Sequence, residues 1–167
     1  MELSKKDRLV LINQFLILEK LYPDETDYYE KHRLALQQGF SLHYEWILEN
    51  VWDDLSEADC RSVLNALAVY RAIVYSFDEL EARHDLTEER VRFPGFDGNY
   101  ESQYLAYARY FIVDLGRYEE LRRGQEYPDF NSHSPMLDKY SRMHEQWESW
   151  GRPLSMSAEK IIVLLEA

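Results

Sequence analysis

Residues 57–84, EADCRSVLNALAVYRAIVYSFDELEARH, are the stretch that decides the fold. Apolar side chains recur in it at alternating three- and four-residue spacing, which is typical of an α-helix. One stripe comprises Cys60, Val63, Leu67, Tyr70, Val74 and Phe77, and a second comprises Ala66, Val69, Ile73 and Leu80. A helix that is apolar on two faces is surrounded by other elements. We therefore predict that this helix is the central element of the fold.

Start and stop signals divide the rest of the chain into further helices. The residues in position to start or cap helices are Ser4, Ser41, Ser56 and Ser134, which Pro135 follows, and those in position to end helices are Pro23, Gly39 and Gly124. No segment alternates with period two for long enough to indicate a strand. The expected fold is all-α, a single domain over residues 1–167 with six to seven helices around the central one. The expected helices span about 5–22, 24–38, 41–54, 57–84, 100–123 and 135–149, with a short last helix after Ser157.

The composition restricts the classes of function. The chain has 167 residues, with 31 Asp and Glu against 19 Lys and Arg, and a net charge of −12. Nucleic acids and anionic membranes bind basic surfaces, so the acid excess argues against both as partners. The one cysteine, Cys60, excludes an intramolecular disulfide and a cysteine-cluster metal site. No cofactor is expected.

The N-terminal segment superficially resembles a signal peptide. Basic residues precede an apolar stretch at 9–18, but Asn13 and Gln14 interrupt it and Glu19 follows it. A first amphipathic helix explains this pattern better. No segment has the roughly 18 to 20 apolar residues that a membrane-spanning helix needs. We therefore expect a cytoplasmic protein.

Three segments together resemble the YfbU-like family of bacterial proteins, which have no assigned activity. They are RVRFPGFDGNYE at 90–101, YLAY at 104–107 and FNSHSPM at 130–136. The resemblance extends over nearly the whole chain. It implies a helical domain that in some members is fused to a DNA-binding helix-turn-helix, and hence a role in sensing a ligand or a partner. It implies no catalytic residues.

Two loops are candidates for a ligand pocket. Residues 93–99 and 129–134 place polar side chains next to phenylalanines, and such groups in ordered loops orient small ligands. The alternative is that these residues are helix caps and turns, because several stand directly before expected helices. We hypothesise that the loops meet and form a small polar pocket. The candidate residues are Arg92, Phe96, Asp97, Asn99, Tyr100, Arg109, Asn131 and His133.

Other chemistry has weaker support in the sequence. An enzyme could use His133 and Asp97 as acid and base, and this is the alternative to a binding module. Cys60 near a helix start could be reactive, although its place on the apolar stripe favours an inert thiol. Glu81 and His84 have the Glu-x-x-His spacing of half a di-iron site, but the other half is missing, so no metal is expected.

Residues 31–48 have the small and apolar residues of a helix-turn-helix, including a turn glycine at Gly39. However, six carboxylates and no basic residue lie between Glu45 and Asp59, and these would repel phosphates. A plain helical hairpin is the better interpretation. No direct binding of nucleic acid is expected.

The first helix carries a candidate protein interface. Leu3, Val10 and Ile17 recur every seven residues, on the side of the helix that also carries Lys6, Asn13 and Lys20. Apolar groups on a face that should contact water indicate self-association or docking to another protein, although scattered exposed apolar residues are normal. The expected function is therefore a non-enzymatic module that binds a small ligand or a protein, with a regulatory role, and that could form a homodimer.

Overall fold

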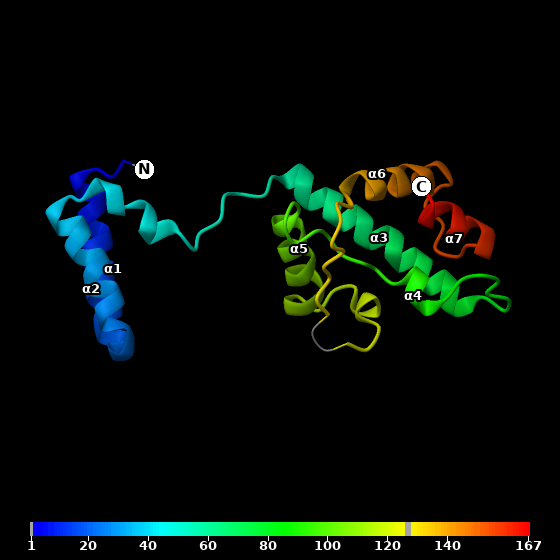
Figure 1. Ribbon diagram of the computed structural model, residues 1–167, viewed down its shortest axis with the longest axis horizontal. Coiled ribbons are helices and arrows are strands. Elements are labelled where there is room, and N and C mark those ends of the chain that lie inside the picture. Colours follow the sequence, from blue (N-terminus) through cyan, green and yellow to red (C-terminus); the bar gives the residue numbers. More distant parts are fainter. Residues whose placement is uncertain (1, 126–127) are drawn as a thin grey trace. The chain divides into compact units, whose positions relative to one another are not determined.

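The computed structural model describes residues 2–125 and 128–167, and the regular elements within them are helices. The described ranges hold no strand, and their β-pairing is limited to an isolated bridge between Phe96 and Asn131. The predicted all-α class is confirmed. The contacts divide the chain into two compact units, Met1–Asp54 and Leu55–Ala167 (Figure 1). The organisation of residues 1–167 as a single domain stays a prediction.

The first unit is a helical hairpin. Helix α1 (Lys5–Leu21) begins with a capping box, in which Ser4 Oγ accepts the N–H of Asp7 and Asp7 Oδ2 accepts the N–H of Ser4. The short 3₁₀ turn η1 (Pro23–Glu25) leads into α2 (Thr26–Gln38). Gly39 ends α2 in the left-handed conformation, with φ of 75°, which glycine adopts without steric cost.

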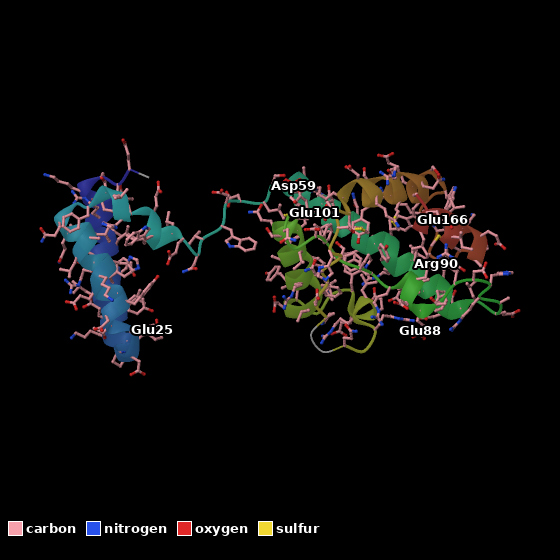
Figure 2. The ribbon with its side chains drawn as sticks, in the orientation of Figure 1. Glu25, Asp59, Glu88, Arg90, Glu101 and Glu166 are labelled. Carbon is pink, nitrogen blue, oxygen red and sulfur yellow. The ribbon has the colours of Figure 1, made fainter. Side chains whose placement is uncertain are left out.

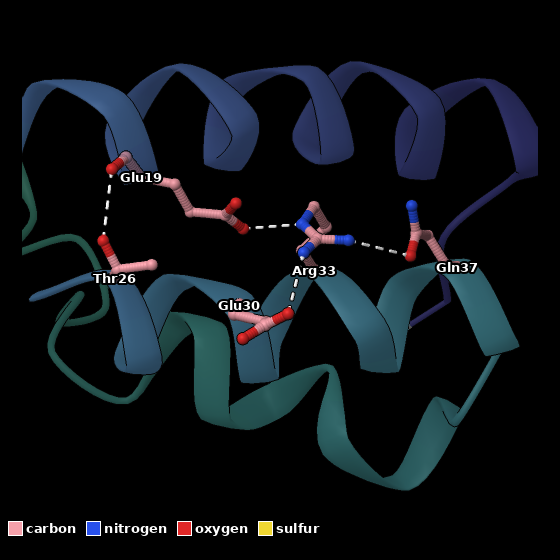
Figure 3. A network of polar contacts seen from close by, with 5 residues as sticks. All are labelled: Glu19, Thr26, Glu30, Arg33 and Gln37. Carbon is pink, nitrogen blue, oxygen red and sulfur yellow. Dashed lines mark hydrogen bonds and ion pairs between the residues drawn. The ribbon is translucent and has the colours of Figure 1, made fainter. Parts of the chain in front are cut away.

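A small core and one arginine hold α1 and α2 together. The buried core of the hairpin consists of Phe15, Leu36 and Tyr44. Arg33 of α2 donates to Glu19 Oε1 of α1 at 2.6 Å, and also to Glu30 and Gln37 on its own helix (Figure 3). The first unit is therefore held together by a small apolar core and by polar contacts between its two helices.

The expected third helix, 41–54, is wrong. The structure has two 3₁₀ turns there, η2 (Ser41–His43) and η3 (Glu45–Leu48), and the residue before η2 is Phe40, which provides no side-chain cap. Aromatic residues crowd this segment and favour the helix less than alanine or leucine do. The tighter turns bring Tyr44 into the hairpin core. The helix-turn-helix pattern at 31–48 consequently lacks a recognition helix.

The second unit is built around α3 (Glu57–Glu79), which Ser56 caps by accepting the N–H of Asp59. Figure 1 shows α5 on one side of α3 and α6 and α7 on the other. Eight residues of the two predicted stripes are buried, and Cys60 and Leu80 are half-buried. The prediction of a central helix therefore holds within this unit. The surrounding elements are α4 (Glu88–Val91), α5 (Ser102–Arg109), α6 (Leu137–Ser149) and α7 (Ala158–Leu165).

Two helix ends differ from the prediction. The central helix ends at Glu79 instead of residue 84, because Leu80 takes an extended backbone while its side chain packs against the core. Helix α5 ends at Arg109 and continues as the π-helical turn η4 (Tyr110–Asp114). Gly116, with φ of 60°, then breaks the direction of the chain, and a 3₁₀ turn, η5 (Glu119–Arg122), follows. The sequence interpretation had placed this break at Gly124.

Within residues 2–125 and 128–167, none of the helices combines the length and apolar character needed to cross a bilayer.

Candidate functional site

The two loops singled out in the sequence lie side by side. The N–H of Phe96 donates to the carbonyl of Phe130 at 3.0 Å, and the N–H of Ser132 donates to the carbonyl of Phe96 at 3.1 Å. The Tyr140 hydroxyl from α6 donates to the carbonyl of Gly95 at 2.6 Å. These hydrogen bonds join segments that are more than 30 residues apart in sequence. We call this contact the loop junction, residues 93–99 with 129–134.

A buried carboxylate, that of Glu101, ties the loop junction to α6. Glu101 Oε1 accepts the N–H groups of Met136 and Leu137 at 2.8 and 2.9 Å, and Oε2 accepts the N–H of Asp97 at 3.1 Å. Glu101 thus caps the first turn of α6, where a negative charge also favours the helix dipole. The expected cap of this helix was Ser134 followed by Pro135, and the structure instead uses a residue 35 positions away from Met136. Figure 2 labels Glu101 in the second unit.

The polar residues of the junction bind backbone groups. Asp97 Oδ1 accepts the N–H groups of Asn99 and Tyr100 at 2.7 and 2.9 Å. Asn131 Oδ1 accepts those of Gly98 and His133 at 3.1 and 3.0 Å. These contacts are the capping and turn roles that were the alternative to a ligand pocket.

The structure brings Phe96, Asp97 and Asn131 together and leaves most other candidates in solvent. Phe96 is fully buried, whereas the exposed candidates are Arg92, Asn99, Tyr100, Arg109 and His133. A hollow of about 510 Å³ beside the junction is lined by both loops, and Arg92 and Asn131 contribute to its wall. A ligand pocket at the junction stays a prediction.

The acid–base hypothesis receives little support from this geometry. Asp97 is 2% exposed and its carboxylate accepts two backbone N–H groups, while His133 is exposed. A general base must reach the proton it removes, and Asp97 is held as a cap.

The structure also shows the surroundings of Cys60 and of the Glu81–His84 pair. The Cys60 thiol is half-buried, with Sγ 3.8 Å from the carbonyl oxygen of Leu55. Glu81 and His84 lie beyond the end of α3, so they do not share a helix face as a di-iron motif requires. His84 Nε2 lies 3.9 Å from Glu159 Oε1 at the surface.

The candidate interface on α1 divides into two parts. Val10 and Ile17 are 52% and 53% exposed, whereas Leu3 is half-buried and packs against the hairpin core. Three further apolar side chains of α1 are exposed to a similar degree, and the sequence interpretation had not included them. We call the exposed set the α1 ridge: Leu9, Val10, Leu16, Ile17 and Leu21.

An apolar groove lies elsewhere in the first unit, between α2 and the turns η2 and η3. Its volume is about 470 Å³, and aromatic rings make up much of its wall, with Lys31 and Glu49 also lining it. Burial lowers the pKa of His32, which therefore favours the neutral imidazole. The sequence analysis considered part of this segment only as a helix-turn-helix and predicted no groove, because the groove lies where the expected third helix is replaced by turns. The aromatic members of the wall are Tyr28, His32, Phe40, His43 and Trp46.

A second polar contact joins α5 to the start of α3. The Tyr104 hydroxyl donates to Asp59 Oδ1 at 2.7 Å, and Ser56 Oγ donates to Asp59 Oδ2 at 2.6 Å. The bond from Ser56 and then that from Tyr104 lower the pKa of Asp59. The same contact raises the pKa of Tyr104 to about 12. Near neutral pH the pair is therefore a carboxylate and a protonated phenol.

Because of this contact, we predict that the stability of the fold depends on pH and that Tyr104→Phe weakens this dependence. A carboxyl group with a depressed pKa in the folded state stabilises the fold above the pKa of the unfolded chain, and this contribution disappears as the pH falls through the folded pKa. Without the hydroxyl, the pKa of Asp59 should rise, though only part of the way because Ser56 still donates. Carboxyl carbon shifts followed by NMR from pH 2 to 6 measure both values. An unchanged Asp59 titration in Tyr104→Phe would show that the hydrogen bond contributes nothing.

The fold defines the class as an all-helical protein. At the loop junction, the residues of its most specific sequence motifs cap helices and bind backbone groups, and they do not form a pair of catalytic groups. The YfbU domain model matches residues 1–167. The UPF0304 protein MJECS11 of Methanocaldococcus jannaschii is 35% identical over 169 residues, which cover 99% of each chain. The chain belongs to the YfbU family, as its motifs indicated.

Proposed function

We propose that this protein is a non-enzymatic interaction module that associates with a second copy of itself through the first unit. The observation that carries this proposal is the distribution of exposed apolar side chains. Among the described residues, fourteen of the twenty exposed large hydrophobic side chains lie in the first 54 positions, which are a third of the chain. The family resemblance adds the expectation of a regulatory role for such a contact.

The amount of apolar surface supports a protein partner. A large apolar side chain buries on the order of 150 Å², so fourteen side chains at about half exposure present roughly 1,000 Å². A stable interface takes about 800 Å² from each partner. Together, the exposed apolar side chains of the first unit offer about the area that one partner contributes to a stable interface.

The small hairpin core favours the same conclusion. Three buried residues, Phe15, Leu36 and Tyr44, form the core of this unit. Helical units below about 70–80 residues rarely obtain sufficient stability from one core, and association with another copy is one remedy. Burying the α1 ridge against a second copy would extend the apolar interior of the hairpin.

The α1 ridge suits pairing of like helices. Val10 and Ile17 repeat after seven residues, the spacing at which helices pack along a common seam. Lys6 and Lys20 lie on the same side of the helix, near its two ends. Their aliphatic stems can cover apolar surface while the ammonium groups reach water. The proposed contact is accordingly α1 against α1 of the second copy.

The variant Val10→Glu with Ile17→Glu tests the proposal. Placing four carboxylates in the paired interface should weaken dimerisation by about a hundredfold, since an unpaired buried charge costs several kcal/mol. Sedimentation velocity over a concentration series measures the change. The matched control is Leu115→Glu with Val163→Glu, because these side chains are 46% and 48% exposed in the second unit. Equal sedimentation of wild type and both variants would rule out the α1 contact.

A further inference from the structure

Helices α3 and α6 carry two polar stripes of the same spacing. Asp59, Ser62 and Asn65 follow one another every three residues on α3, and Asp138, Ser141 and His144 do so on α6. Residues at this spacing project from one side of a helix. Helices α3 and α6 pack against each other, and all six residues line one pocket of about 280 Å³. The stripes therefore converge on a common hollow, of which Tyr104 is also part.

The two carboxylates give this pocket a negative charge. The hydrogen bonds from Ser56 and Tyr104 keep Asp59 ionised, and Asp138 lies in the first turn of α6. In the part of the chain that the structure describes, the ion pairs formed by Lys and Arg involve other carboxylates. Neither pocket carboxylate is thus neutralised by a basic side chain there.

The remaining groups favour a ligand with several hydrogen-bond donors. Ser62 and Ser141 offer hydroxyl oxygens, Asn65 an amide oxygen and His144 an imidazole nitrogen. An ammonium group has three donors and one positive charge, so it matches a carboxylate with neighbouring hydroxyls. The volume is slightly below the roughly 300–1,000 Å³ of drug-sized ligand sites, which limits the ligand to a small molecule.

We propose that the pocket between α3 and α6 binds a small organic ammonium ion. The ammonium group lies between Asp59 and Asp138, and the hydroxyl and amide oxygens of the two stripes accept its remaining N–H groups. Tyr104 holds Asp59 in place through its hydrogen bond and is a positioning residue. This site lies within the second unit and does not depend on pairing through the α1 ridge.

Putrescine tests this site, with 1,4-butanediol as the uncharged counterpart of equal length. Titrations of the full chain at about 0.15 M salt limit non-specific attraction to a protein of charge −12. Putrescine should bind saturably and shift the amide NMR signals of Ser62, Asp138 and Ser141. Butanediol should bind at least about tenfold more weakly, because it lacks the charge-assisted hydrogen bonds.

Asp138→Asn and a matched control separate the site from general charge effects. Asp138→Asn should weaken putrescine binding about tenfold, the loss expected for one charged hydrogen bond. Glu79→Gln removes the same charge from an exposed position at the other end of α3 and should leave binding unchanged. Equal binding of putrescine and butanediol overturns the proposal. So does an equal loss in the two variants, which would mean attraction to the net charge alone.

Discussion

Replacing Gly95 by alanine should destabilise the second unit by about 4 kcal/mol or more, the range reached when backbone atoms are forced apart. Gly95 has φ of 88°, and a Cβ atom there would lie 1.7 Å from the carbonyl oxygen of Phe130. That oxygen is backbone and accepts the N–H of Phe96, so it cannot move without opening the loop junction. Urea denaturation followed by circular dichroism measures the loss.

Gly124→Ala is the matched control for this prediction. Gly124 has a similar φ of 78°, but among the described residues beyond its chain neighbours no atom lies within 4 Å of its added Cβ. Gly124→Ala should therefore lose only the stability that an alanine in the left-handed conformation costs, about 1–2 kcal/mol. If both variants lose the same free energy of unfolding, the close approach of Gly95 to Phe130 is not what constrains the junction.

Glu101→Ala should have the second large effect, a loss of about 3–5 kcal/mol. The carboxylate accepts three backbone N–H groups and is 4% exposed, so its removal leaves buried donors without partners. Each hydrogen bond to a charged group contributes about 1.5–3 kcal/mol, and the contributions within one network are not additive. The free energy of unfolding from urea denaturation is the measured quantity.

Two further variants make the Glu101 prediction specific. Glu101→Gln keeps one acceptor oxygen, so its loss of stability should lie between zero and that of Glu101→Ala. Glu79→Ala removes an exposed carboxylate of α3 and should change stability by no more than about 0.5 kcal/mol. Amide exchange of Met136 and Leu137 should accelerate most in Glu101→Ala. Stability equal to that of Glu79→Ala would show that Glu101 is not the cap of α6.

The elements that could be predicted from the sequence are those with strong local signals. Helix α3 has two apolar stripes, and Ser56 caps it as expected. Gly39 ends α2 in the conformation that glycine favours. In these places local propensity and tertiary packing favour the same structure, and the prediction agrees with the observed bounds to within a few residues.

The predictions failed where tertiary contacts override local preference. Tyr44 enters the hairpin core, and this contact forms in 3₁₀ turns rather than in the expected third helix. The central helix stops at Glu79 because Leu80 packs inward from an extended backbone. Neither contact leaves a periodic pattern in the sequence, since each depends on a single side chain.

The candidate site was predicted in part. The meeting of the loops was hypothesised because both place polar side chains next to phenylalanines, but Glu101 was missed although it lies only two residues after the loop 93–99. The signal that could have found it is a carboxylate four residues after Asp97, directly before α5. The polar stripes of α3 and α6 each look like a solvated helix face in the sequence. Only the packing of the two helices shows that the stripes face one pocket.

The mass of the wild-type protein in solution tests the central claim most directly. Light scattering coupled to size-exclusion chromatography should give twice the chain mass of 20.1 kDa, or about 40 kDa, at concentrations above the dissociation constant of the dimer. Dilution should shift the mass toward that of the single chain. A mass of 20.1 kDa at the highest concentration reached would contradict self-association through the α1 ridge.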